Sequence, residues 1–330
     1  MQLIIPPPDI ALAGLRALKT IGTVDGPLRP LERRFLDSVQ AQLLTTAIDI
    51  DQLRPITPRQ LAAAVQQAEP RERILCGCII MALIDGEASE AEGVVLEQFA
   101  LALGVSSHAL KDVQRIIHHN LTAARIDMTR RSFIGQRARS YLADQGARGL
   151  VRVVRSMLGI EDRPLALRYQ ALGTAPRGTL GREYYEFIRR NHFLLPGEKG
   201  AAPEIVVFHD CLHVLAGYDT TSIEETQIAS FQAGMLKKDP IFGLLFMLAQ
   251  FHLGIRMTPV TGAEKLVADP KLMLEAFVRG TKVTRDLCVD WTPQHDFERG
   301  VDELRREYNI EPRPGAPSAG VVADSQRVSA

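Results

Sequence analysis

The sequence predicts an all-α protein, in which an N-terminal helical bundle is followed by a mostly helical metal-binding domain. Almost every periodic segment has the spacing of a helix, and runs of β-branched residues that alternate with the period of a strand are nearly absent. The chain of 330 residues is long enough for two domains with buried cores. Helices are expected at residues 31–44, 58–68, 72–84, 91–103, 107–118 and 131–142.

The composition excludes several classes of protein. Lysine plus arginine number 39, as do aspartate plus glutamate, so no basic field favours nucleic acid as a partner. The first residues lack the basic region of a signal peptide, and the longest apolar run, 241–249, is too short to span a bilayer. We therefore expect a cytoplasmic protein that binds no nucleic acid. Its four cysteines form no CxxC pair or disulfide framework, which fits reduced thiols: Cys76, Cys78, Cys211 and Cys288.

The N-terminal part has the features of a compact helical bundle. Residues 74–84 are apolar on all sides, which predicts a buried central helix. The acidic segment Asp85-Gly-Glu-Ala-Ser-Glu-Ala-Glu92 fails the EF-hand pattern and fits a capping box from Ser89 to Glu92. This segment resembles the tellurite-resistance (TerB-like) helical domain over about residues 25–120, which implies a helical bundle and a candidate interaction module.

We expect the chain to divide into four parts. These are a lead segment at 1–24, a TerB-like helical domain at 25–125, a metal-binding domain at 126–312 and a tail at 313–330. The tail is rich in Pro, Gly, Ser and Ala and has no apolar periodicity, which predicts disorder. The apolar run at 241–249 fits either the wall of a lipid-tail channel or a buried core helix.

The motif His209-Asp210-Cys-Leu-His213, followed after eleven residues by Glu225, is the most informative stretch of the chain. In a helix, positions i, i+1 and i+4 lie at roughly 0°, 100° and 40° around the axis, so the three side chains share one face. The two histidines lie one turn apart, which is the spacing that lets two nitrogens bind one metal.

The chain after His213 can turn back, so that Glu225 reaches the same metal. Gly217 is a plausible helix C′, and residues 219–222 offer N-caps for a second helix. Ser222-x-x-Glu225 also fits a capping box that needs no metal. Four such residues at fixed spacing seldom arise together by chance. We therefore predict that the metal ligands and catalytic residues are His209, Asp210, His213 and Glu225.

Sequence blocks flank the motif on both sides. Upstream lies Gly178-Thr-Leu-Gly-Arg-Glu-Tyr-Tyr-Glu-Phe187, and downstream come Arg279-Gly280, Asp290-Trp291 and Leu304-Arg-Arg-Glu-Tyr-Asn-Ile310. In this order the blocks and the HDxxH-x11-E motif resemble the coenzyme Q biosynthesis protein four family over about residues 135–312.

This resemblance implies a mostly helical fold, a zinc ion on the four motif residues and a hydrophobic channel for a polyprenyl tail. It implies a metal-dependent decarboxylase that removes the ring carboxylate, with hydroxylation at that carbon, from a prenylated 4-hydroxybenzoate-type intermediate. It also implies peripheral contact with the cytoplasmic face of the membrane and partners among other quinone-biosynthesis proteins, with a homo-oligomer left open.

The chain departs from the family pattern at two points. Asp219 stands where proline is usual, and Glu224 precedes Glu225, so either glutamate is a candidate ligand, although the spacing favours Glu225. The N-terminal helical domain is not part of the usual family member. Two imidazoles and two carboxylates suit Zn²⁺, and Mn²⁺ or Fe²⁺ also fit. Either all four residues bind the metal, or Asp210 orients an imidazole and leaves a position open for water or substrate.

Other functions fit part of the motif. A non-catalytic polyprenyl-lipid-binding scaffold of a quinone-biosynthesis complex needs the same metal and channel, so the sequence does not separate it from an enzyme. An HD-type phosphohydrolase would combine His209-Asp210 with residues such as His192 and Asp290, but it leaves the second histidine and the glutamate unexplained. A zincin-like protease needs HExxH.

Overall fold

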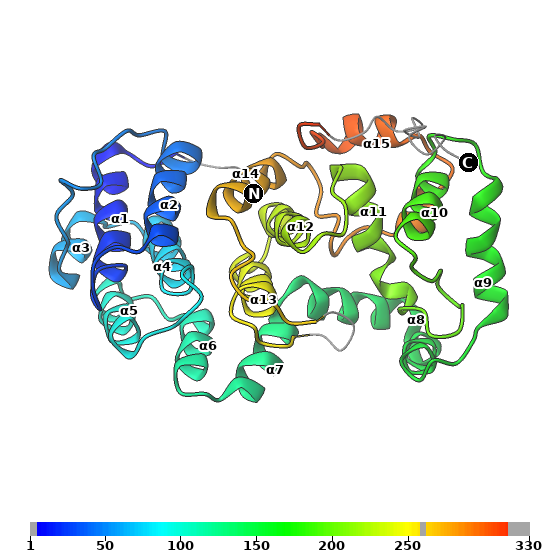
Figure 1. The fold of residues 1–330 in the computed structure, drawn as a ribbon, viewed down its shortest axis with the longest axis horizontal. Helices are drawn as coiled ribbons and strands as arrows, with labels where there is room; N and C mark the ends of the chain where they lie inside the picture. The colour runs from blue at the N-terminus through cyan, green and yellow to red at the C-terminus, as the bar shows by residue number, and fades with distance from the viewer. Residues whose placement is uncertain (1–4, 258–261, 316–330) are drawn as a thin grey trace, which may run out of the picture. The chain divides into compact units, whose positions relative to one another are not determined.

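The computed structural model describes residues 5–257 and 262–315, and in these ranges every extended regular element is a helix (Figure 1). The all-α prediction is confirmed. The α-helices are α1 (Pro8–Ile21), α2 (Pro30–Val39), α3 (Pro58–Ala64), α4 (Ala68–Met81), α5 (Glu90–Leu103), α6 (His108–Ile117), α7 (Leu121–Arg131), α8 (Phe133–Met157), α9 (Arg163–Gln170), α10 (Leu180–Arg190), α11 (Val207–Ala216), α12 (Ser222–Met235), α13 (Ile241–Phe251), α14 (Pro270–Thr281) and α15 (Val301–Tyr308).

The predicted helices occur with shifted ends. Helix α2 continues into a π-helical turn over Gln40–Leu44, which accounts for the expected helix at 31–44. Helix α8 is longer than expected and is interrupted at Gly146, where φ is 56° and ψ is −146°. Helix α1 was not expected, because prolines precede and open it. It begins at Pro8, where the missing N–H of proline is tolerated, and it buries Leu15 completely.

The chain folds into two compact units that do not follow chain order. The first unit contains Met1–Gln136 and Thr221–Lys282, and the second contains Arg137–Thr220 and Val283–Ala330. The segment that begins at Thr221 therefore folds with the N-terminal helices. The predicted division at residue 125 stays a prediction.

One hydrophobic core runs through the first unit. It includes Leu15 and Leu75 from the N-terminal helices, together with Ala233 of α12 and Leu245 of α13. Every residue of α13 from Phe242 onward is buried, which favours the core-helix interpretation of the apolar run. Among the described residues, no helix is long and apolar enough to cross a membrane.

Helices α12 and α14 lie side by side (Figure 1). Glycines at their contact allow the close approach. A methyl group added to Gly234 would lie 2.2 Å from the carbonyl oxygen of Phe277, and one added to Gly280 would lie 2.0 Å from that of Phe231. Neither position has room for a side chain. The Arg279-Gly280 block thus contains a close helix contact, and the Arg279 guanidinium lies over the Phe231 ring.

In the second unit, the block that begins at Gly178 packs against the segment before α15. The amide of Gly181 donates to the carbonyl of Phe297, and the amide of Val301 donates to the carbonyl of Gly178. A methyl group at Gly181 would lie 3.1 Å from the same Phe297 oxygen. Two blocks that are far apart in sequence are therefore structural neighbours.

The predicted end signals of helix α5 are confirmed. Ser89 and Glu92 form the expected capping box at the start of α5, and Gly104 ends that helix in the left-handed conformation with φ 66°. The predicted disorder of the tail falls on residues that lie almost entirely outside the described part, which ends at residue 315.

Candidate metal centre

Helix α11 carries both histidines of the motif. It ends at Gly217, whose left-handed φ of 76° confirms the predicted C′ glycine and turns the chain out of the helix. The amides of Gly217 and Tyr218 both donate to the carbonyl of His213, so the helix end is closed by backbone hydrogen bonds. His209 and His213 lie one turn apart on this helix, as predicted.

Helix α12 begins at Ser222, and its cap distinguishes the two glutamates. Thr221 is the N-cap, and its hydroxyl accepts from the amide of Glu224 and donates to the Glu224 carboxylate at 2.6 Å. The N-cap is therefore Thr221, which pairs with Glu224, and Ser222 is the first residue of the helix. This engages Glu224 in the cap, which favours Glu225 as the carboxylate that reaches the histidines.

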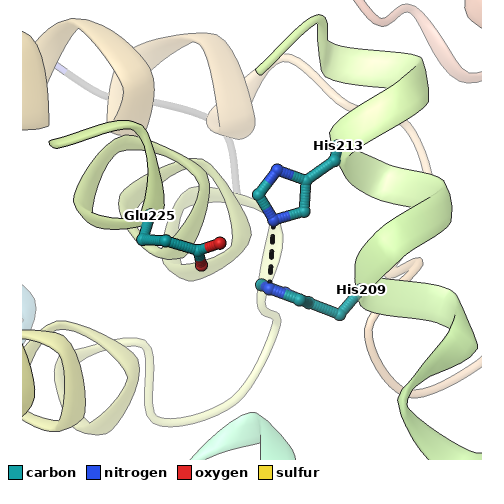
Figure 2. Close-up of side chains that lie close together, drawn as sticks. All are labelled: His209, His213 and Glu225. Carbon is teal, nitrogen blue, oxygen red and sulfur yellow. Dashed lines mark hydrogen bonds between the residues drawn. The ribbon is translucent and has the colours of Figure 1, made fainter. Parts of the chain in front are cut away.

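His209, His213 and Glu225 form a group that has the geometry of a metal site (Figure 2). One potential ligand atom from each residue lies within 4.8 Å of the others. The Nε2 atoms of the two histidines are 3.1 Å apart. Two nitrogens bound to one tetrahedral zinc are separated by about 3.3 Å, given Zn–N bonds of about 2.0–2.1 Å. The imidazoles thus need little movement to bind one ion, and the carboxylate needs a small approach.

The histidines differ in their surroundings. His213 is 1% exposed, and its ring stacks on that of Phe187, with centroids 5.3 Å apart and an interplanar angle of 29°. His209 and Glu225 are half-buried. Only a neutral imidazole has a lone pair to give to a metal. Phe187 ends the block that begins at Gly178, so this block supports one of the candidate ligands.

Asp210 is not a member of the group. It lies on α11 beside His209, and its negative charge acts on other residues. Burial, followed by the charge of Asp210, raises the pKa of the Tyr184 phenol and of the Cys211 thiol well above their usual ranges. The role of Asp210 as a fourth ligand stays a prediction, and the structure brings together three of the four expected residues.

Arg305 supports the end of α11 and was not singled out by its sequence. Its guanidinium donates to the carbonyls of Leu215 and Val214 at 3.0 and 3.1 Å, which are among the acceptors left unpaired at a helix C-terminus. The only sequence signal was the Leu304-Arg305 pair in the last block. Nothing in that spacing identifies α11 as its partner.

The residues that the phosphohydrolase interpretation requires do not join the group. Among the described residues, neither His192 nor Asp290 belongs to a three-residue cluster of possible ligands with His209. Asp290 instead borders a pocket of 370 Å³ in the second unit, which is also lined by Trp291 and His295. The geometry therefore does not favour that interpretation.

Two imidazoles and one carboxylate are a donor set with well-known uses. Catalytic zinc sites combine two histidines and a glutamate with an open position for water or substrate, and iron(II) oxygenases use two histidines and one carboxylate. The residues present fit either ion, and they fit Mn²⁺. If these three residues held an ion, a coordination position would be available to a substrate oxygen.

Comparison with known proteins tests the resemblance seen in the motif blocks. No family model matches the chain. A Danio rerio protein named "Ubiquinone biosynthesis protein COQ4 homolog, mitochondrial" is 26% identical over a match of 245 residues, and the match covers 70% of this chain and 83% of that protein. The resemblance to the coenzyme Q biosynthesis family is confirmed.

The match is longer than residues 135–312 and the tail together, so it extends into the N-terminal helices. This agrees with the first unit, in which those helices share a core with α12–α14. The name of the Danio rerio protein places that protein in mitochondria. The cytoplasmic location expected for this chain stays a prediction.

Proposed function

We propose that this protein acts in ubiquinone biosynthesis as a metal-dependent decarboxylase of a prenylated 4-hydroxybenzoate-type ring, with hydroxylation at the carbon that loses CO₂. The observation that carries the proposal is the group of His209, His213 and Glu225. Its support is the similarity to a ubiquinone biosynthesis protein over 70% of the chain. The expected partners are the prenylated substrate and other quinone-biosynthesis proteins.

The residues of the group define what the site would do. His209 and His213 would hold the ion through neutral nitrogens, and Glu225 would add one negative charge, so a divalent ion would keep a net positive charge. The bound ion would act as a Lewis acid on a carboxylate or phenolate oxygen of the substrate. The stacked pair of Phe187 and the buried His213 would hold one side of the site rigid and dry.

The overall conversion requires an oxidant. Loss of CO₂ leaves an electron pair on the ring carbon. Attachment of a hydroxyl group to that carbon needs dioxygen together with a two-electron donor. Zinc has no redox chemistry, so Fe²⁺ or Mn²⁺ would be the ion if the protein itself activates dioxygen. With zinc, the protein would perform the decarboxylation and depend on a partner enzyme for the hydroxylation.

The test is an assay with purified protein and a prenylated 4-hydroxybenzoate, without partner enzymes. We expect release of CO₂ from ring-carboxylate-labelled substrate by protein loaded with Fe²⁺, Mn²⁺ or Zn²⁺, and hydroxylated product when dioxygen and a reductant are also present. Protein treated with a chelator should release no CO₂. Absence of turnover with every ion, together with retained binding of the prenylated compound, would contradict catalysis and favour the lipid-binding scaffold.

An exposed apolar helix supports peripheral contact with a membrane. The second half of α8, after the break at Gly146, and the residue that follows the helix expose five apolar side chains at positions that span about 120° around the helix axis. Its only charged residues between positions 146 and 160 are arginines, which suits an anionic lipid surface. The apolar residues are Leu150, Val151, Val154, Met157 and Leu158, and the arginines are Arg148, Arg152 and Arg155.

Glutamates at the most exposed positions should abolish this contact. Met157 and Leu158 are 72% and 69% exposed, so the pair Met157→Glu and Leu158→Glu should leave folding intact and lower vesicle affinity by about tenfold or more. Co-flotation with phosphatidylcholine–phosphatidylglycerol vesicles measures the effect. Leu101→Glu is the matched control, because Leu101 is 84% exposed in the first unit. Equal flotation of the pair variant and the parent would exclude this helix as the contact.

A further inference from the structure

The turn that follows α4 has no role in the function proposed above, although its Asp-Gly-Glu sequence stands out. Gly86 in this turn has a φ of 90°, and a methyl group there would lie 2.4 Å from the Leu266 side chain. Leu266 belongs to the connector between α13 and α14, whose described residues are 252–257 and 262–269. The turn is therefore packed directly against this connector, within the first unit.

A buried histidine joins the turn to the connector. His252 is 0% exposed, and its Nε2 lies 2.8 Å from the carbonyl oxygen of Ile84. Its Nδ1 accepts from the amide of Ala268 at 3.2 Å. A carbonyl only accepts and an amide only donates, so the ring must be neutral with its proton on Nε2. Both ring nitrogens are satisfied, and His252 joins the turn after α4 to the later part of the connector at Ala268.

The connector continues to the start of the helix that carries the carboxylate ligand. The amide of Glu264 donates to the carbonyl of Gln250 at 2.9 Å, and the Glu264 carboxylate accepts from the Ser222 hydroxyl at 2.5 Å. Ser222 is the first residue of α12, and Glu225 follows it by three residues on the same side of the helix. Hydrogen bonds and the intervening backbone therefore link Ile84 to Ser222 through His252, Gln250 and Glu264, and we call this series the path.

We propose that the turn at Ile84–Gly86 and the connector position Glu225 for metal binding, with Ser222 and Glu264 as positioning residues. The proposal rests on the proposed function, since it requires that Glu225 be a ligand. A ligand on the first turn of a helix is held only as well as that turn is held. The N-terminal helices would then be a structural part of the metal centre and not a separate interaction module.

The test is titration of the full-length, metal-free protein with Co²⁺, followed by visible absorption. Ser222→Ala and Glu264→Ala each remove the hydrogen bond to the connector, and each should weaken Co²⁺ binding by about tenfold, as loss of supporting contacts does at other metal sites. Glu264→Gln keeps an oxygen that accepts from Ser222, so it should bind as the parent does. Thr174→Ala is the control for loss of a hydroxyl, because the Thr174 hydroxyl bonds only within its own turn.

The N-terminal end of the path is tested with Gly86→Ala. A φ of 90° is strained for any residue with a side chain, so the substitution should distort the turn and the connector packed against it and weaken Co²⁺ binding by a similar factor. The double variant of Gly86→Ala and Ser222→Ala should weaken binding by less than the product of the two single effects, because both act through one connector. The melting temperature of each metal-free variant is measured alongside, since a purely structural role would lower it without changing affinity.

The outcomes separate this proposal from the proposed function. If the parent binds Co²⁺, and the folded Ser222→Ala and Glu264→Ala variants bind it within twofold of the parent, the positioning role is wrong and the metal centre stands. If the parent does not bind Co²⁺ at all, the metal centre itself is wrong and the positioning role falls with it. If Ser222→Ala does not fold, the two Glu264 variants test the positioning role. Weaker Co²⁺ binding by Glu264→Ala than by Glu264→Gln supports that role, and equal binding contradicts it.

Discussion

Replacing His213 with alanine is expected to abolish metal binding and any metal-dependent activity together. His213 is 1% exposed and supplies one of the two nitrogens that lie 3.1 Å apart. Loss of supporting contacts alone typically weakens metal sites by 10–100-fold, so loss of a direct ligand should weaken binding by more than about 100-fold. Elemental analysis of the purified protein and Co²⁺ titration measure the change.

A second histidine provides the control for this prediction. His118 is exposed at the end of α6 and belongs to no ligand group among the described residues, so His118→Ala should retain parental metal content. The buried ring of His213 also packs on Phe187, so circular dichroism must show that the variant is folded. Full turnover by a folded, metal-free His213→Ala protein would overturn the proposed mechanism.

The largest stability effect is expected at the contact of α12 and α14. A methyl group at Gly280 would lie 2.0 Å from the carbonyl oxygen of Phe231 and 3.1 Å from the Cα of Gly234, and all of these atoms belong to backbone that cannot rotate away. We expect Gly280→Ala to lower the free energy of unfolding by about 3 kcal/mol or more, at the upper end of overpacking effects. Urea unfolding of the metal-free protein measures it.

Gly26→Ala is the matched control, because a methyl group there meets nothing within 4 Å. Its effect should stay within about 0.5 kcal/mol. Helix α12 carries Glu225, so Gly280→Ala should also weaken metal binding, whereas Gly26→Ala should not. An unchanged unfolding midpoint for Gly280→Ala would show that the two helices can separate at little cost.

The local features of the site follow from the sequence because they depend on neighbours in the chain. The i, i+4 spacing brings His209 and His213 together on any helix, and a glycine at 217 ends that helix through its left-handed backbone. The capped turn before α12 was also readable, since hydroxyl residues at 219–222 are strong N-caps. Short-range rules were enough for these features.

Features that depend on distant residues could not be read in the same way. Arg305 meets the end of α11 from 90 residues away, and no pattern in either segment identifies the other. The glycine at 280 appeared only as part of a family block, and its physical reason, the close approach of α12, became visible in the packed core. Helix α1 was missed because its prolines mask a buried face.

The sequence alone determined the all-α class, the helix that carries the two histidines and the chemistry of the predicted ligands, because helical periodicity and capping act over a few residues. Only the tertiary structure decided that Glu224 bonds to the N-cap Thr221 while Glu225 joins the histidines, and that Asp210 lies outside their group. Only the tertiary structure joined residues 221–282 to the N-terminal helices. Those choices depend on which helix faces bury apolar surface together, and burial is a property of the whole fold.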